Sequence, residues 1–343
     1  MIGFARLKIE ERDPYFAETA NRRGISQLIV EKDFWVCFTL RVLFNLEKLA
    51  EQFVFKGGTS LSKVFGVIER FSEDVDLSLN PAWLGFNGEN SLENAPSKTK
   101  RMAGLEKLDQ ACTDAVKNII RPDLESAITG FIGPSPSQRE YLHFEVDKQS
   151  KSPTIVFHYP TNQADAQGYI RPQVKLELGS LTDQHPTGTH EVTPWVAEEF
   201  PDTFSEGSCK VVALEAERTF WEKATILHAE YHRSKESPMR NRFSRDCYDM
   251  VTLATHDSGK RALADLSLLE RVANFKQTYF PAAWARYETA RPGTLKLVPP
   301  KHRLDELKAD YKAMQEMFYG KPPSFDELLE QLSRLERTIN QKL

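Results

Sequence analysis

A double glycine separates two short apolar stretches, and the second stretch carries two aspartates. Residues 53–55 (Phe-Val-Phe) predict a short buried strand, and Gly57 and Gly58 predict the turn after it. A helix is expected to begin at the next residue, Thr59. A second strand is expected over residues 75–79, directly after Asp74. This order of turn, helix and acidic strand makes the segment the most informative part of the sequence.

The glycine turn has the chemistry of a phosphate-binding site. Glycines let the backbone approach a phosphate closely, and the N-terminus of a helix offers N–H donors to it. The hydroxyls of Thr59 and Ser60 are further candidate donors. We therefore expect Gly57, Gly58, Thr59 and Ser60 to bind a nucleotide, with Lys63 of the same helix as an additional candidate.

Asp74 and Asp76 are two positions apart, so on a strand both point to one face while Val75 points into the core. Two carboxylates on one face can hold Mg²⁺ through oxygen ligands. Metal ions held roughly 3.5–4 Å apart can activate an attacking hydroxyl and stabilise the leaving pyrophosphate. Each fragment alone also fits a simple turn or a solvated strand face. Together they are typical of the polymerase-β-like nucleotidyltransferase fold.

A third acidic residue is expected on a neighbouring strand of such a fold. Residues 174–178 (Val-Lys-Leu-Glu-Leu) alternate as a half-buried strand does, which places Lys175 and Glu177 on one face. Glu177 is our candidate for a third metal ligand or for the base that accepts the acceptor's proton. The alternative is an exposed Lys/Glu pair, because strand alternation alone also predicts one.

The length of 343 residues exceeds what one hydrophobic core usually organises, so two lobes are expected. We predict an α/β (α+β) nucleotidyltransferase domain with a mixed sheet over residues 1–205. A helical domain should follow over residues 206–343, the pattern turning helical from about Val211. In the first domain, Ser26 should cap a helix, residues 105–120 should form another, and residues 141–146 and 154–159 should pair as a hairpin.

Composition places few limits on function but favours the cytoplasm. A net charge of -4 argues against a nucleic-acid coat over the whole surface, although it permits a local basic channel. Residues 1–12 lack the apolar core of a signal peptide, and the longest apolar stretch, residues 34–44, is too short to span a membrane. The four cysteines are scattered, which predicts reduced and mostly buried thiols. We expect no association with a membrane.

Several segments together resemble one family of enzymes. Residues 57–61 (Gly-Gly-Thr-Ser-Leu) and 70–77 (Arg-Phe-Ser-Glu-Asp-Val-Asp-Leu) resemble the motifs of the AbiEii/AbiGii nucleotidyltransferase toxins, a type IV toxin–antitoxin family that includes the MenT-like enzymes. Residues 31–35, 217–223 and 245–249 resemble further motifs of that family. The similarity runs from about Gln27 to the C-terminus and so covers most of the chain.

The resemblance extends the candidate site to the helical part of the chain. It implies that Lys223 faces the phosphates of the nucleotide, where its ammonium would neutralise developing charge, and that Asp246 is catalytic. Asp249 shares a helix face with Asp246 and is interpreted as structural. From the residues alone, Lys223 could instead pair with neighbours at the surface, and Asp246 with Arg242.

The densest basic segment lies between these two helical motifs. Arg240, Arg242 and Arg245 could contact RNA phosphates, which would bind an acceptor strand without specifying its bases. The alternative is a solvated charged face. His228 and His232 nearby do not match a zinc-protease helix, because Glu does not follow the first histidine, and we expect a surface pair instead.

The resemblance also implies substrates and partners. These are an NTP with Mg²⁺, the 3′ end of tRNA as the acceptor in several members, with a consequent block of translation, and a separately encoded antitoxin, often a transcriptional regulator. Three alternatives stay open: the same transfer to a protein or small-molecule hydroxyl, a non-catalytic nucleotide-binding protein, and transfer of phosphate rather than nucleotide. A set of five residues counts against mere binding, which does not need all of them: Gly58, Asp74, Asp76, Lys223 and Asp246.

Overall fold

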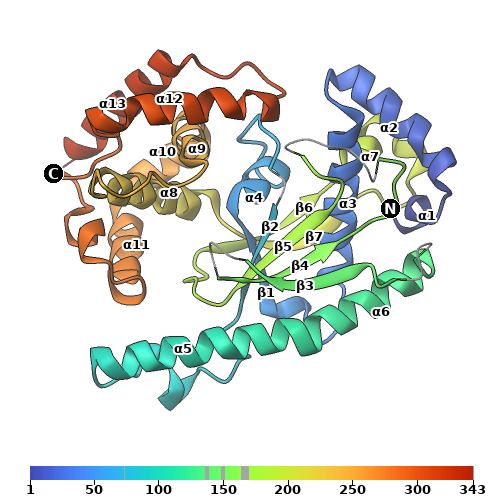
Figure 1. Ribbon diagram of the computed structural model, residues 1–343, viewed down its shortest axis with the longest axis horizontal. Coiled ribbons are helices and arrows are strands. Elements are labelled where there is room, and N and C mark those ends of the chain that lie inside the picture. The colour runs from blue at the N-terminus through green and yellow to red at the C-terminus, as the bar shows by residue number, and fades with distance from the viewer. Residues whose placement is uncertain (73, 136–138, 148–150, 164–169, 343) are drawn as a thin grey trace. The chain divides into compact units, whose positions relative to one another are not determined.

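The chain folds into two compact units. The computed structural model describes residues 1–72, 74–135, 139–147, 151–163 and 170–342, so Glu73 of the acidic motif lies outside the described residues. The first unit comprises Met1–Val64 and Ser72–Ala213. The second comprises Phe65–Phe71 and Leu214–Leu343 (Figure 1). Each unit is described separately below.

The first unit is built on a mixed sheet in the strand order β3-β4-β5-β2-β1-β7-β6 (Figure 1). Its strands are β1 (Phe53–Lys56), β2 (Asp74–Leu79), β3 (Leu142–Val146), β4 (Pro153–Phe157), β5 (Val174–Gly179), β6 (Thr187–Val192) and β7 (Cys209–Leu214). The central strand β2 runs antiparallel to β1 and parallel to β5, while β3 and β4 form an antiparallel hairpin. The expected mixed sheet, both motif strands and the hairpin are confirmed.

The first unit also contains helices of very different lengths. They are α1 (Ile2–Ala5), α2 (Ile9–Arg23), α3 (Gln27–Leu43), α4 (Gly57–Lys63), α5 (Lys98–Ala115), α6 (Arg121–Ile132) and α7 (Trp195–Glu199). The expected helix over residues 105–120 is part of a longer one, because a π-helical turn at Val116–Ile120 joins α5 to α6. The sequence patterns had not indicated α6 or β6.

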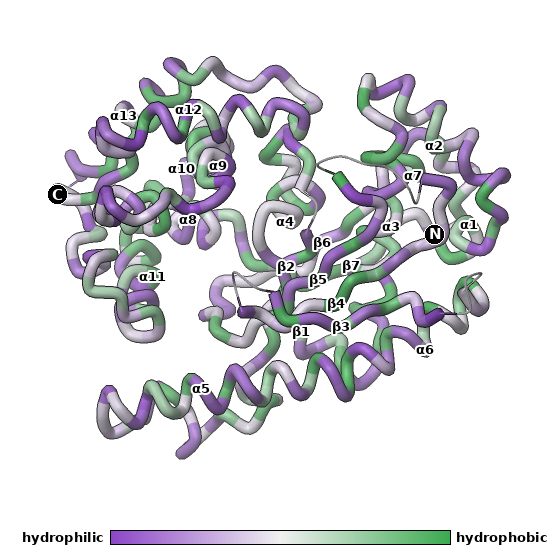
Figure 2. Tube along the Cα trace, in the orientation of Figure 1, coloured by the Kyte–Doolittle hydropathy of each residue, from purple (hydrophilic) through white to green (hydrophobic). Residues whose placement is uncertain are grey.

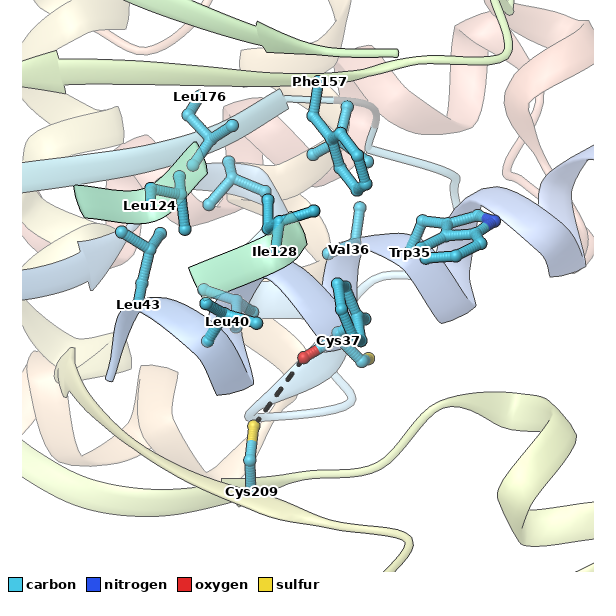
Figure 3. Packing of buried hydrophobic residues seen from close by; sticks show 14 of the residues in the cluster. Trp35, Val36, Cys37, Leu40, Leu43, Leu124, Ile128, Phe157, Leu176 and Cys209 are labelled. Atoms are coloured by element: carbon cyan, nitrogen blue, oxygen red, sulfur yellow. Dashed lines mark hydrogen bonds between the residues drawn. The ribbon is translucent and has the colours of Figure 1, made fainter. Parts of the chain in front are cut away.

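One face of the sheet packs against α3 and the α5–α6 region. Apolar residues from β2, β4 and β5, such as Val75, Phe157 and Leu176, belong to the same buried cluster as α3. Figure 3 shows Leu124 and Ile128 of α6 beside Val36 of α3 and Leu176 of β5. The tube in Figure 2 shows hydrophobic and hydrophilic residues alternating along α5 and α6, as expected of helices with one buried face.

Helix α3 is held by its cap and by its burial. The side chain of Ser26 accepts a hydrogen bond from the backbone N–H of Ile29, as the sequence predicted. Most of α3 is buried, so this helix forms the centre of the core rather than one amphipathic face. All four cysteines are buried and free, and the Sγ of Cys209 lies 3.9 Å from the carbonyl oxygen of Cys37 (Figure 3). The prediction of reduced, buried thiols agrees with this arrangement.

The second unit is helical. It contains α8 (Ala216–Tyr231), α9 (Phe243–Thr255), α10 (Asp257–Ala264), α11 (Leu266–Tyr279), α12 (Leu304–Ala313) and α13 (Phe325–Asn340). Helix α8 packs against α9, α10 and α11, and α9 also packs against α12 and α13. The apolar face predicted for α8 is buried, including Phe220 and Trp221.

The helical region begins slightly later than the sequence pattern indicated. Residues 211–214 belong to β7, which lies beside β1 in the sheet, so packing divides the chain after Ala213. The domain boundary drawn between residues 205 and 206 stays a prediction. Phe65–Phe71 joins the second unit because the backbone N–H of Phe71 donates to the carbonyl of Met317 and that of Tyr319 donates to Glu69.

His228 is buried, so the expected surface pair with His232 is wrong for this residue. Its Nε2 lies 3.1 Å from both the carbonyl oxygen of Arg286 and the hydroxyl of Thr289, and its Nδ1 accepts from the backbone N–H of Lys296. Burial lowers the pKa of His228 to about 4. The neutral side chain of His228 therefore attaches the loop that contains Arg286, Thr289 and Lys296 to α8. No helix among the described residues is long and apolar enough to cross a membrane.

Candidate active site

The glycine turn and the acidic strand meet at Gly57 and Asp76. Gly57 has a φ of +79°, which a residue with a side chain rarely adopts. A Cβ placed there would lie 2.0 Å from Oδ2 of Asp76, so the carboxylate rests directly against the glycine backbone. The turn therefore needs glycine both for its conformation and for space. Gly58 continues into α4, which begins at Gly57.

The two hydroxyls predicted to bind phosphate form hydrogen bonds inside the protein. The hydroxyl of Thr59 donates to the carbonyls of Ser72 and Asp74 and so attaches α4 to the start of β2. The hydroxyl of Ser60 donates to the carbonyl of Gly57 at 2.9 Å. Both side chains are buried. The structure thus shows them bracing the turn, and their contact with a phosphate stays a prediction.

Lys63, the other candidate on α4, forms a buried ion pair with Asp33 of α3. Its Nζ lies 2.7 Å from Oδ1 of Asp33, and the two side chains are 6% and 2% exposed. The backbone N–H of Trp195 donates to the second oxygen of Asp33, and the Trp195 ring lies 4.8 Å from the ammonium. Sequence analysis did not identify Asp33 as a partner. The ammonium is neutralised inside the protein, which favours a structural role, and its predicted contact with a nucleotide is untested.

Strand register brings four charged side chains to one face of the sheet. Asp74 is paired with Lys175, and Asp76 with Glu177, along the parallel strands β2 and β5. The intervening residue, Val75, points to the opposite face and is fully buried. The expectation that Val75 lies in the core is confirmed, and the predicted acids lie on adjacent strands.

Lys175 lies within this acidic face. Its Nζ lies 2.6 Å from Oε1 of Glu177 and 2.8 Å from Oδ2 of Asp147. The Lys/Glu pair that strand alternation allowed is therefore present. Burial alone would lower the pKa of Lys175, but its hydrogen bonds to Asp147 and Glu177 and the charge of Asp74 raise it. Asp147 follows β3, and no sequence motif had indicated it.

The acidic residues at this face have the oxygen chemistry that a divalent cation prefers. Two carboxylates project from one side of β2, and the carboxylate of Asp76 occupies the space that the missing Cβ of Gly57 leaves. In the part of the chain that the structure describes, no group of three or more Asp, Glu, His or Cys side chains is arranged to hold a metal ion. The pairing of Glu177 with Lys175 is consistent with this finding. A metal-binding role for Glu177 stays a prediction.

The second unit contains another cluster, centred on Lys223 of α8. Its Nζ lies 2.5 Å from Oδ1 of Asp246 and 2.9 Å from Oδ2 of Asp249. The two predicted residues, Lys223 and Asp246, are therefore in direct contact. The ammonium is paired with carboxylates of α9 rather than with neighbours on its own helix, because α8 and α9 pack side by side.

Arg70 completes this cluster from a distant part of the sequence. It forms a bidentate ion pair with Asp249, with both N–O distances 2.8 Å. Asp249 is fully buried and Arg70 nearly so. Burial opposes ionisation of Asp249, yet Arg70 and Lys223 together lower its pKa to about 2. The structural interpretation of Asp249 agrees with this geometry, and Arg70 of the acidic motif serves the helical unit.

The three arginines proposed to contact RNA have different environments. Arg240 is exposed, and its guanidinium lies 3.7 Å from Asp246, at the edge of the Lys223 cluster. Arg242 precedes α9 with a φ of +59°. Arg245 is half-buried within α9. Asp246 has a contact with Arg240 that the sequence did not suggest, and contact of any of the three arginines with RNA stays a prediction.

Comparison with known proteins identifies the family. A sequence profile described as "Nucleotidyl transferase AbiEii toxin, Type IV TA system" matches residues 40–331, most of the chain. Among solved structures, MenT4, a nucleotidyltransferase toxin from Mycobacterium tuberculosis H37Rv, matches with 12% sequence identity and a TM-score of 0.34, covering 87% of this chain and 98% of that chain. A search of curated protein sequences found no match. The extent of the profile match shows that the chain belongs to the AbiEii family of nucleotidyltransferase toxins.

Proposed function

We propose that this protein transfers a nucleoside monophosphate from Mg-NTP to an acceptor hydroxyl, with the 3′ end of tRNA as the acceptor. The observation that carries the proposal is the contact between Asp76 and the Gly57 turn in a chain of the AbiEii family. That contact places a carboxylate beside a backbone that a phosphate can approach closely. Transfer to tRNA would block translation, and a separately encoded antitoxin of transcriptional-regulator type would restrain it in the cytoplasm.

In the proposed reaction, the acceptor oxygen attacks the α-phosphorus and forms a new P–O bond. The bond between the α-phosphorus and the bridging oxygen breaks, and pyrophosphate leaves. Asp74 and Asp76 would hold Mg²⁺, which when bound supplies charge stabilisation for the phosphates. Glu177 is the candidate to accept the proton of the acceptor hydroxyl. Lys223 is the candidate to neutralise the charge of the nucleotide phosphates, as the family resemblance implies. Arg240 is the candidate to contact the backbone of the acceptor.

The test is a labelling experiment. The purified protein is incubated with Mg²⁺, total tRNA and each α-³²P-labelled NTP in turn, and the products are separated on a denaturing gel. The double variant Asp74→Ala/Asp76→Ala is the control. It should keep its fold, because both side chains are only partly buried on the polar face of β2. We expect label on tRNA with the wild type and none with the control.

Other results would redirect the proposal in defined ways. Label on protein with none on tRNA would show that the acceptor is a protein hydroxyl. Label transferred from γ-³²P-NTP, with none from α-³²P-NTP, would indicate phosphate transfer. Transfer by the double variant at the wild-type rate would contradict the metal-site assignment. The absence of any label would favour the alternative in which the protein binds a nucleotide without catalysing its transfer.

A further inference from the structure

The ammonium of Lys175 lies among carboxylates at the face proposed to bind metal. It forms close ion pairs with Glu177 and Asp147, and strand register places it beside Asp74. The charge of Asp74 also acts on it. A cation supplied by the protein thus sits at a face where an oxygen-rich site would otherwise attract a metal ion.

The cluster around Lys175 is partly exposed to solvent. The side chains of Lys175, Asp147 and Glu177 are 21%, 23% and 24% exposed. A partly exposed ion pair costs less to separate than a fully buried one, because water can solvate the separated charges. A dissolved cation can therefore reach these carboxylates.

Lys175 also occupies an oxygen of Glu177, the acidic residue that could complete a metal site. Glu177 is next to Asp76 along the paired strands, but its Oε1 is bound to the ammonium. Replacing a monovalent ammonium by a divalent ion would release that oxygen for coordination. Removing the ammonium altogether would leave a more negative face, which attracts a divalent ion more strongly.

We propose that Lys175 is an internal counter-cation of the carboxylate face, which competes with Mg²⁺ for Glu177 and sets the metal concentration at which the site fills. This inference rests on the proposed function, since it assumes that Asp74 and Asp76 bind the metal. Lys175 acts here as a positioning residue for Glu177. Its effect should be visible in metal binding without any substrate.

The experiment measures binding of Mn²⁺, as a spectroscopic substitute for Mg²⁺, by electron paramagnetic resonance on the full chain without nucleotide. Lys175→Met should bind Mn²⁺ about tenfold more tightly than the wild type, because a positive charge has been removed from the site. Lys175→Arg should retain wild-type affinity. Lys210→Met is the matched control, since Lys210 is an exposed lysine on β7, and its affinity should not change.

The variants also separate failure of this inference from failure of the proposed site. Equal affinity in Lys175→Met and wild type would overturn the inference, provided that Asp74→Ala/Asp76→Ala reduces binding. If the double variant binds Mn²⁺ as well as the wild type does, the proposed metal site fails and the inference fails with it. Lys175→Gln supplies a second neutral variant if Lys175→Met does not fold, and circular dichroism verifies the fold of each protein.

Discussion

Each unit of this protein contains a lysine bound by two carboxylates, but water reaches the two clusters to different degrees. Lys175, in the first unit, is about one-fifth exposed, and so are both of its acidic partners. Lys223, in the second unit, contacts Asp249, whose side chain has no exposed surface. Similar ion pairs therefore have different energetic consequences.

Burial decides which of these clusters can exchange its partners. Charges removed from water are held in place because separating them would leave an unpaired charge in the interior. The Lys223 cluster also includes the bidentate Arg70–Asp249 pair, which joins α9 to the segment Phe65–Phe71 within one unit. The Lys175 cluster lacks such burial. We infer that the first cluster is adapted to exchange cations, whereas in the second the buried Arg70–Asp249 pair holds the unit together, with Lys223 at its less buried edge.

Asp249→Asn is expected to have the largest effect, because it leaves the buried Arg70 and the half-buried Lys223 with one carboxylate charge fewer. The free energy of unfolding should fall by about 3–5 kcal/mol, measured by urea denaturation of the full chain. Asp257→Asn is the matched control, since Asp257 is an exposed residue of α10 whose side chain is 75% exposed. A loss below about 1 kcal/mol, the range of surface pairs, would contradict the contrast between the clusters.

The ion pair of Lys63 and Asp33 tests whether burial, rather than the unit in which a pair lies, determines how much the pair contributes to stability. They belong to the same unit as Lys175, but both side chains are nearly inaccessible. Lys63→Met should reduce the free energy of unfolding by about 3 kcal/mol, because Asp33 keeps a buried charge without its partner. Lys48→Met, at an exposed position, should have little effect. Urea denaturation measures both changes.

Variants of the same pair also distinguish two roles for Lys63: positioning α4 and binding the nucleotide directly. If Lys63 positions α4, Asp33→Asn and Lys63→Met should change the KM for NTP in the same direction. If Lys63 binds phosphate directly, Asp33→Asn should release the ammonium and leave the KM unchanged or lower it. We expect the first result, and an increase in KM in Lys63→Met alone would contradict it.

Local patterns in the sequence predicted the parts of the fold that depend on nearby residues. Strand β1 is a short apolar run, strands β2 and β5 alternate in polarity, and Ser26 precedes an apolar helix, so each could be identified within a short window. The acidic residues Asp74 and Asp76 were recognised for the same reason. Their pairing with Lys175 and Glu177 depends on strand order, which no local window contains.

The missed residues have partners far away in the sequence. Arg70 belongs to the acidic motif, yet its partner Asp249 is 179 positions away. Asp147 follows a hairpin strand without any motif, and its proximity to Lys175 results from the sheet. The prediction that His228 is exposed was wrong because its partners lie in a distant loop. Those partners include Arg286 and Thr289, and the helical pattern of α8 gives no sign of them.

Acidification should produce the smallest of these effects on stability, and it concerns the buried cluster. The pKa of Asp249 is lowered from 3.8 to about 2 against the cost of burial, because Arg70 and Lys223 favour the charged form. Its stabilisation is complete above the unfolded value of 3.8 and is lost as the pH falls through 2. The loss attributable to this group should be about 2 kcal/mol, measured by urea denaturation between pH 4 and pH 2. The variant Asp249→Asn should lack this component, since it has no carboxylate to protonate at that position. An identical decline in both proteins would show that other groups control the acid sensitivity, and Asp249 would then not be the charge that distinguishes the Lys223 cluster from the partly exposed Lys175 cluster.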